Sequence, residues 1–189
     1  MIEQLAAETK GWLHPAEGPA LRRYAAECEG PYLELGTYCG KSTLWIGAAA
    51  RTNGTVLFTV DHHRGSPEMA AGNNCHDPDV LDEHGRHDTL PHLRATLAAA
   101  DLEEHVVPIV GRSQTVGAHW KTPVGFLFID AGHDEKSVVA DYELFSPWCT
   151  GVLAFHDVAT EASAAVDAAV SDGWGHVETI DGCLGIYRR

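Results

Sequence analysis

Short apolar runs alternate with amphipathic stretches through most of the chain. Five of these runs predict buried strands, and they read PYLEL (31–35), TVLFTVD (55–61), HVVPIV (105–110), GFLFID (125–130) and GVLAFHD (151–157). Helices are predicted between and after them, at residues 42–50, 88–100, 136–145 and 161–171. Because the strands are apolar on both faces, the alternation indicates a mostly parallel sheet covered by helices on both sides.

The two ends of the chain depart from this alternation. Residues 1–30 predict a helical segment with helices at 2–9 and 17–29, separated by Pro15. The last stretch, GHVETIDGCLGIYRR, predicts two short strands around Asp181-Gly182, a pair typical of hairpin turns. The 189 residues show no internal repeat or linker, so we expect a single domain over 1–189.

Polar residues stand where the predicted strands end. These residues are Glu34, Gly36, Asp61, Gly111 to Ser113, Asp130 to His133, His156 and Asp157. Parallel α/β sheets bind ligands at the carboxyl ends of their strands, so these residues are expected to gather around one site. The segment 62–86 is long for a connection and rich in His, Asp and Asn. It is predicted to be a substrate lid or loop, with a disordered insertion as the alternative.

Composition narrows the classes of function. Thirteen basic and twenty-seven acidic residues give a formal charge of −14, so the chain lacks the basic surface that nucleic-acid binding uses. No apolar run approaches the ~20 residues that span a bilayer, and no export signal is visible at the N-terminus. Five scattered cysteines without C-x-x-C spacing fit reduced thiols, and a cytoplasmic location is therefore expected.

The stretch ELGTYCGKST (34–43) comes close to two nucleotide-binding motifs. It contains G-x-x-x-G-K-S, one residue short of the P-loop, whose length fixes its phosphate cradle. It also lacks the second glycine of the dinucleotide fingerprint G-x-G-x-x-G. An acidic strand end suits a cationic ligand, and Asp61 could accept both hydroxyls of a ribose. These features favour S-adenosylmethionine, and a P-loop or nicotinamide enzyme remains the alternative.

Longer segments resemble one enzyme family. YLELGTYCGKST, TVDHHRG, FLFIDAGHDEKSVVADYELFSPW and GVLAFHDV together resemble the class I S-adenosylmethionine-dependent methyltransferases. GWL, DHHRGSPE, HDTLPHLRATL and GRSQTV are similar in order to a small sugar O-methyltransferase branch. That branch includes enzymes that act on macrolide sugars and on mycobacterial methylmannose polysaccharides. The resemblance covers nearly the whole chain, with conservative departures at CTGV and at Ala131.

The resemblance implies a fold and a reaction. The expected fold is Rossmann-like α/β, with a mostly parallel seven-stranded sheet, helices on both faces and a C-terminal antiparallel hairpin. The expected reaction transfers a methyl group from S-adenosylmethionine to a hydroxyl of a small acceptor, such as a mannoside or another sugar. A methyltransferase fold kept only for binding is a further alternative. A second copy of the chain, forming a homodimer, is a candidate partner.

The same resemblance implies roles for individual residues at the cofactor. The methionine end would be held by Glu34, Gly36, Gly40 and Ser42, and the ribose by Asp61 with His62 covering it. Gly111, Arg112 and Ser113 would border the adenine, and Asp130 would complete the cofactor site. Tyr38 and Trp120 are candidates to line the pocket.

An alcohol that keeps its hydroxyl proton is a poor nucleophile, so a base must take that proton or a metal must make the hydroxyl more acidic. His133, three residues beyond Asp130, is predicted to be the catalytic base, with His156 as its rival. Asp130 and Asp157 end neighbouring strands and could share Mg²⁺ through carboxylate oxygens. His156 is the third candidate metal ligand, although imidazole is a less natural partner for magnesium than a carboxylate.

Overall fold

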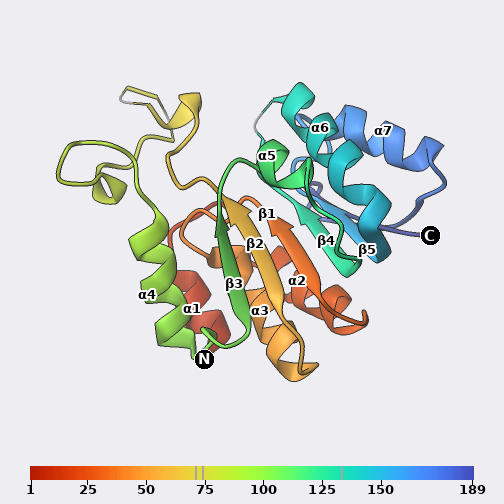
Figure 1. The fold of residues 1–189 in the computed structure, drawn as a ribbon, viewed down its shortest axis with the longest axis horizontal. Helices are drawn as coiled ribbons and strands as arrows, with labels where there is room; N and C mark the ends of the chain where they lie inside the picture. Colours follow the sequence, from red (N-terminus) through yellow and green to blue (C-terminus); the bar gives the residue numbers. More distant parts are fainter. Residues whose placement is uncertain (71, 74, 133) are drawn as a thin grey trace.

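The computed structural model describes residues 1–70, 72–73, 75–132 and 134–189, which build a seven-stranded sheet (Figure 1). The strands are β1 (Tyr32–Leu35), β2 (Leu57–Asp61), β3 (Val106–Val110), β4 (Val124–Ile129), β5 (Cys149–Phe155), β6 (Gly175–Ile180) and β7 (Leu184–Arg188). Their order is β3-β2-β1-β4-β5-β7-β6. β1 to β5 pair in parallel, whereas β7 is antiparallel to both β5 and β6. The predicted sheet and C-terminal hairpin are therefore confirmed.

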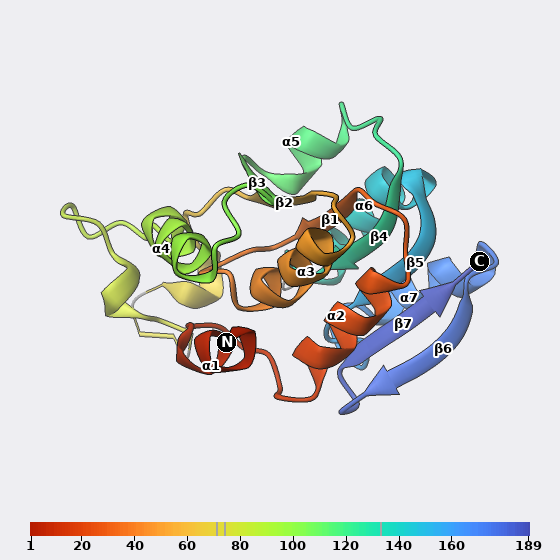
Figure 2. The ribbon, with the colours of Figure 1, turned by 90° about the horizontal axis from the view of Figure 1, so that it is seen from below.

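Helices cover both faces of this sheet (Figure 2). One side carries α2 (Glu17–Ala26), α3 (Lys41–Thr52) and α4 (Leu90–Ala100), with α1 (Ile2–Glu8) packed against α3 and α4. The other side carries α5 (Ser113–Gly117), α6 (Glu135–Phe145) and α7 (Ser163–Ser171). The predicted helices are confirmed with ends shifted by up to three residues, but α5 was not expected. Its five residues are too few to show an amphipathic period.

Two apolar cores fill the spaces between the sheet and its helices. Phe126 and Phe128 of β4 pack on the side of α2 and α3, and the residues between and after them, Leu127 and Ile129, pack on the side of α6. All four are at most 1% exposed. Alternate residues of a strand point to opposite faces, so a run that is apolar throughout requires helices on both sides.

The order of the strands reverses between β1 and β4. From β1 the sheet continues to β2 and β3 on one side and to β4 and β5 on the other. Helices leave the ends of β1 and β4 toward opposite faces, so the crevice between those ends is the expected ligand site of such a sheet. Within the described residues, no helix is long and apolar enough to cross a membrane.

The described residues of the segment 62–86 lie beside this crevice and include two short 3-10 helices, η1 (Pro67–Met69) and η2 (Pro78–Val80). Lys10 ties it to the N-terminal region, because its ammonium group lies 2.5 Å from Asp77 and 2.9 Å from Asp79. A bridge between Leu81 and His87 closes its end. A third 3-10 helix, η3 (Ser146–Trp148), joins α6 to β5.

Candidate functional site

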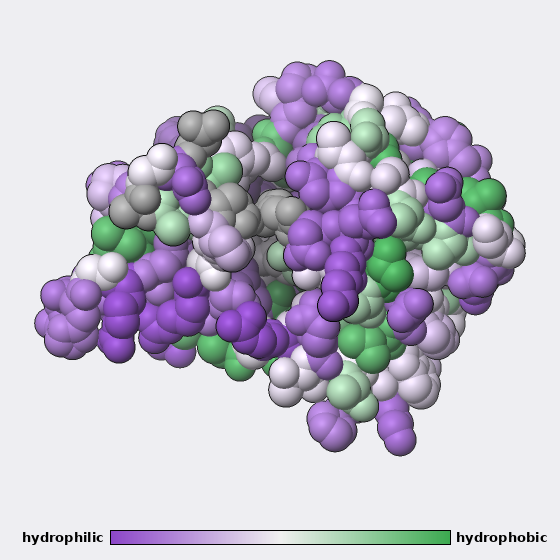
Figure 3. All heavy atoms as spheres, turned by 90° about the horizontal axis from the view of Figure 1, so that it is seen from above, coloured by the Kyte–Doolittle hydropathy of each residue, from purple (hydrophilic) through white to green (hydrophobic). Residues whose placement is uncertain are grey.

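Two adjoining hollows open at the carboxyl ends of the parallel strands, on the face shown in Figure 3. Their volumes are about 440 Å³ and about 570 Å³, within the range of ligand sites in proteins. Residues that line both hollows are Gly36, Asp61, His62, Gly65, Ser66 and Ala131. An elongated ligand could therefore extend from one hollow into the other across the end of β1.

The chain between β1 and α3 makes a compact turn with three residues at positive φ. Gly36 has φ +87°, Tyr38 +48° and Gly40 +94°. Gly36 lines both hollows, whereas Gly40 is the N-cap of α3 and lines neither. The ammonium group of Lys41 donates to the carbonyl oxygen of Gly11 at 3.2 Å, so this lysine is tied to the N-terminal region. The turn is thus not a phosphate-binding loop with its lysine at the centre.

Glu34 stands behind the first hollow and not in its wall. Its fully buried carboxylate accepts hydrogen bonds from the hydroxyls of Ser42 (2.6 Å), Thr43 (2.6 Å) and Thr59 (2.8 Å). Burial raises the pKa of Glu34 to about 7, although the three hydroxyls stabilise the ionised form. Of these residues only Ser42 lines the hollow, so the structure separates Glu34 from the ligand position and connects it there through Ser42.

Asp61 fixes the end of β2 to the turn after β1. One carboxylate oxygen accepts from the backbone N–H groups of Thr37 (3.0 Å) and Tyr38 (2.9 Å), and the other accepts from that of His63 (2.7 Å). A carboxylate offers about four acceptor positions, so capacity remains toward the hollows that Asp61 lines. His62, the next residue, also lines both hollows, beside the predicted ribose position.

The turn between β3 and α5 lines the second hollow. Gly111, Arg112 and Ser113 contribute to its wall, where the sequence predicted the adenine. The Ser113 hydroxyl bonds to the carboxylate of Asp141 on α6, whose pKa is raised to about 6 by burial. These contacts hold the start of α5 against α6 and so define one side of this hollow.

The three predicted metal ligands come together in the first hollow. His156 Nδ1 lies 3.5 Å from Asp130 Oδ1 and 3.3 Å from Asp157 Oδ2. One donor atom from each residue lies within 4.8 Å of the other two, an arrangement that could hold a cation. Asp157 has φ +55°, a conformation that aspartate adopts more readily than most residues. The two carboxylates fit the oxygen preference of magnesium.

The charges in this cluster depend on one another. Burial raises the pKa of Asp130 to about 7, against the lowering effect of His156. Burial alone would lower the pKa of His156, but hydrogen bonds to Asp157 and Glu17 and the charge of Asp130 raise it to about 11. In this arrangement His156 is protonated at neutral pH, so a cation that binds at Nδ1 would have to displace that proton. His133, the predicted base, lies outside the described residues.

An aromatic wall, consisting of Trp12, Tyr38 and His87, faces the same hollow. The ring centroids of Trp12 and Tyr38 are 5.2 Å apart, and those of Tyr38 and His87 are 6.1 Å apart. Trp12 is 55% exposed, which is unusual for so large an apolar side chain. Both ring nitrogens of His87 are buried and have no hydrogen-bond partner in the described part of the chain.

Sequence reasoning placed Tyr38 among the pocket candidates but missed Trp12 and His87. Trp12 and His87 belong to two segments that carry the resemblance, GWL and HDTLPHLRATL, and nothing local in the sequence shows that these segments meet. Trp120 does not line either hollow and packs against Phe58 and Phe145, with ring centroids 5.5 and 5.9 Å away.

Comparison with known proteins gives the family of the chain and the proteins that share its fold. Residues 33–158 match a family described as "Methyltransferase domain". Among solved structures, the O-methyltransferase NovP has a TM-score of 0.70 at 18% identity, over 92% of this chain and 79% of its own. An O-methyltransferase from Bacillus cereus in complex with SAH has a TM-score of 0.67 at 15% identity, over 100% and 90%. CalS11, a TDP-rhamnose 3'-O-methyltransferase of calicheamicin biosynthesis, has a TM-score of 0.64 at 16% identity, over 91% and 77%.

Proposed function

The chain belongs to the methyltransferase-domain family, and from that premise we propose that it transfers a methyl group from S-adenosylmethionine to a hydroxyl of a sugar or related natural product. The family match covers more than half of the chain, and the fold is shared with O-methyltransferases.

The paired hollows support an S-adenosylmethionine site that extends across the end of β1. We propose that Gly36 and Ser42 border the methionine end in the first hollow, with Glu34 behind them. Asp61 would accept the ribose hydroxyls, and Gly111 and Ser113 would border the adenine in the second hollow. The carboxylates of the first hollow complement a sulfonium, because opposite charges attract more strongly in a partly buried site than in water.

The acidic end of the first hollow supports activation of the acceptor. Methyl transfer is an in-line displacement, so the residues must orient a hydroxyl oxygen behind the methyl group and remove its proton. We propose that Asp130, Asp157 and His156 hold a divalent cation, which when bound would lower the pKa of the acceptor hydroxyl. His133 is proposed as the base on the strength of its position in the sequence.

The aromatic wall supports a sugar as the acceptor. Aromatic rings offer a flat apolar face, and a pyranose has apolar C–H faces beside its hydroxyls. The partnerless nitrogens of His87 could bond to those hydroxyls, because a buried polar group gains most when a missing partner is supplied. The single observation that carries this assignment is the wall of Trp12, Tyr38 and His87 in the hollow that also contains Asp130 and Asp157.

The proposal is tested with labelled S-adenosylmethionine and a panel of mannosides, deoxysugars, catechols and carboxylic acids. We expect methylated sugars, identified by mass spectrometry, and no turnover of the acids. Trp12→Ala should raise the KM of the sugar about tenfold and leave the Kd of S-adenosylhomocysteine unchanged, because losing a stacked ring costs roughly 0.5–1.5 kcal/mol or more. Trp12→Phe should restore most of the loss. Turnover of catechols alone would contradict the sugar assignment. Absence of methyl transfer to every acceptor in the panel would contradict the proposed transfer to a sugar or related hydroxyl.

A further inference from the structure

Glu17 is a buried carboxylate that the donor and acceptor positions leave unexplained. It begins α2 and is 1% exposed. Its Oε2 atom accepts from the backbone N–H of His14 at 2.8 Å and lies 3.2 Å from Nε2 of His156. Its Oε1 atom is buried without a hydrogen-bond partner in the described part of the chain. Removing a carboxylate from water is unfavourable unless partners compensate, so this position requires a reason.

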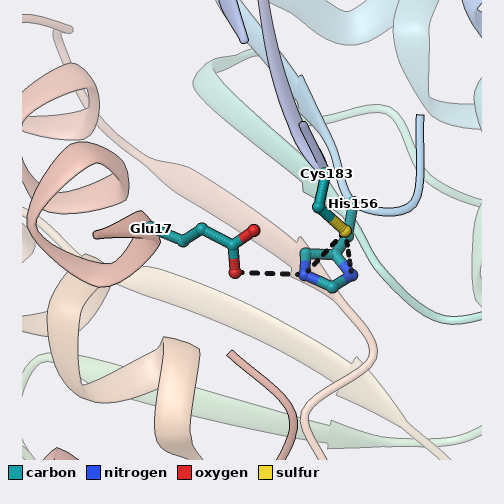
Figure 4. Close-up of side chains that lie close together, drawn as sticks. All are labelled: Glu17, His156 and Cys183. Atoms are coloured by element: carbon teal, nitrogen blue, oxygen red, sulfur yellow. Dashed lines mark hydrogen bonds and ion pairs between the residues drawn. The ribbon is translucent and has the colours of Figure 1, made fainter. Parts of the chain in front are cut away.

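The imidazole of His156 lies between two sets of carboxylates. Its Nδ1 atom faces Asp130 and Asp157, whereas its Nε2 atom faces Glu17, as Figure 4 shows for the latter pair. A histidine that binds a metal through one nitrogen commonly donates the N–H of the other nitrogen to a carboxylate, which fixes both ring and tautomer. His156 matches this arrangement, because Nδ1 faces the two proposed metal ligands and Nε2 faces the carboxylate of Glu17.

We infer that Glu17 is a positioning residue for the metal site: it accepts a hydrogen bond from Nε2–H of His156 and thereby directs Nδ1 toward the cation held by Asp130 and Asp157. This inference rests on the cation site of the proposed function. It gives the N-terminal region a role in a site at the strand ends, where His156 follows Glu17 by 139 residues.

Packing fixes Glu17 where this role requires it. A β-carbon on Gly18 would stand 2.2 Å from Nε1 of Trp45, so the first turn of α2 lies directly against α3. The N-terminal turn of a helix also favours a carboxylate through the helix dipole. Glu17 is therefore held by its own helix as well as by its partners, as an orienting group must be.

Cys183 completes the surroundings of the cluster from the turn between β6 and β7. Its thiol donates to Asp157 Oδ1 at 3.2 Å. Glu17, His156 and Cys183 could together hold a cation by proximity alone. The sulfur lies 3.6 Å from Nε2 and 3.9 Å from Nδ1 of His156, nearly equidistant from both. A metal bound to Nε2 would lie outward from that nitrogen, whereas the sulfur lies nearly as close to Nδ1 as to Nε2. We therefore assign Cys183 the role of a hydrogen-bond donor to Asp157 and not that of a ligand to a second metal.

Manganese binding provides the test, because Mn²⁺ accepts both oxygen and nitrogen ligands and is read by electron paramagnetic resonance without turnover. Glu17→Gln keeps the shape of the side chain and removes its charge. We expect the Kd for Mn²⁺ to rise about 10–100-fold, the usual effect of losing an outer partner, with the Kd of S-adenosylhomocysteine unchanged. The matched control is Glu178→Gln, since Glu178 also ties α2 to the hairpin, through Arg23 and Tyr24, without touching His156.

A second measurement needs no variant. In ¹⁵N-histidine spectra of the wild-type protein with Mg²⁺, His156 should be protonated at Nε2 and bare at Nδ1. Equal Mn²⁺ affinity in Glu17→Gln and wild type, or a proton on Nδ1 in the presence of Mg²⁺, would overturn the role of Glu17. Absence of Mn²⁺ binding by the wild type would overturn the cation site itself. A Co²⁺–thiolate absorption band lost in Cys183→Ser would instead make Glu17, His156 and Cys183 the metal site.

Discussion

A β-carbon added to Gly36 would stand 2.2 Å from the carbonyl oxygen of Asp130. The ends of β1 and β4 meet this closely only because residue 36 has no side chain, and its φ of +87° also disfavours any other residue. The contact determines how near the turn after β1 lies to the end of β4, where Asp130 stands. The proposed cofactor and cation positions are thus joined by a single backbone approach.

Gly36→Ala should therefore lower the free energy of unfolding by at least about 2–4 kcal/mol, because it adds a steric clash to an unfavourable φ. Urea denaturation gives this value. Gly54→Ala is the matched control: Gly54 has φ +62°, but nothing lies within 4 Å of its added β-carbon. That variant should lose only about 1–2 kcal/mol. Equal losses in the two variants would show that the approach to Asp130 is not tight.

Glu34 should make stability depend on pH. Its pKa in the folded protein is about 7, above its ordinary value of 4.5, so the unfolded chain loses the proton first as pH rises. The contribution of protonated Glu34 to the free energy of unfolding is then fully present below pH 4.5 and declines toward pH 7. Denaturation of wild type and Glu34→Gln at both pH values should show wild type losing up to about 3 kcal/mol relative to the variant. A wild type that instead gains stability relative to Glu34→Gln as pH rises would mean that Glu34 is ionised when buried.

Asp61→Ala should weaken the binding of S-adenosylhomocysteine by roughly 2–4 kcal/mol, through loss of charge-assisted hydrogen bonds to the ribose. Isothermal titration calorimetry measures this affinity, at a temperature well below that at which the variant unfolds. The variant should also unfold at a lower temperature, because the backbone N–H groups of Thr37, Tyr38 and His63 lose their acceptor. Asp172→Ala removes a carboxylate that bonds to Tyr142 and lines neither hollow, so it should leave affinity intact. Unchanged affinity in Asp61→Ala would exclude the ribose role.

Removal of the cation should stop turnover. Excess chelator is expected to abolish methyl transfer, and added Mg²⁺ to restore it, because the acceptor hydroxyl would otherwise keep its proton more firmly. Asp157→Asn should need far more Mg²⁺ for half-maximal rate than wild type. Binding of S-adenosylhomocysteine should persist in chelator, since most of its proposed contacts come from β1, β2 and the turn after β3. Full activity in chelator would leave Asp130 and Asp157 without a metal role.

His133→Ala should lower kcat by about 10²–10⁴-fold, the usual contribution of a positioned base, with little change in cofactor affinity. The wild-type rate should rise with pH through an apparent pKa of ~6.5. Near-normal activity of His133→Ala, with loss of activity in His156→Ala, would exchange the two assignments.

The sequence determined the fold through local patterns. Runs such as FLFI in β4 are apolar on both faces, and only a sheet covered on two sides buries them. The parallel order then brought the strand-end residues Asp61, Asp130, His156 and Asp157 into one hollow, as expected. Asp181 and Gly182, with φ of +52° and +74°, form the hairpin turn that their residue types indicated.

Tertiary structure alone decided where individual side chains point. Glu34, expected at the ligand, turns toward three hydroxyls behind it, since a buried carboxylate takes the donors that packing supplies. Glu17 meets His156, and Trp12 meets Tyr38, although neither pair shares a local pattern. Hydrophobic periodicity specifies which face of an element is buried, but not which distant residue lies across from it. That depends on how each helix and loop is placed against the sheet, which the whole set of packing contacts determines.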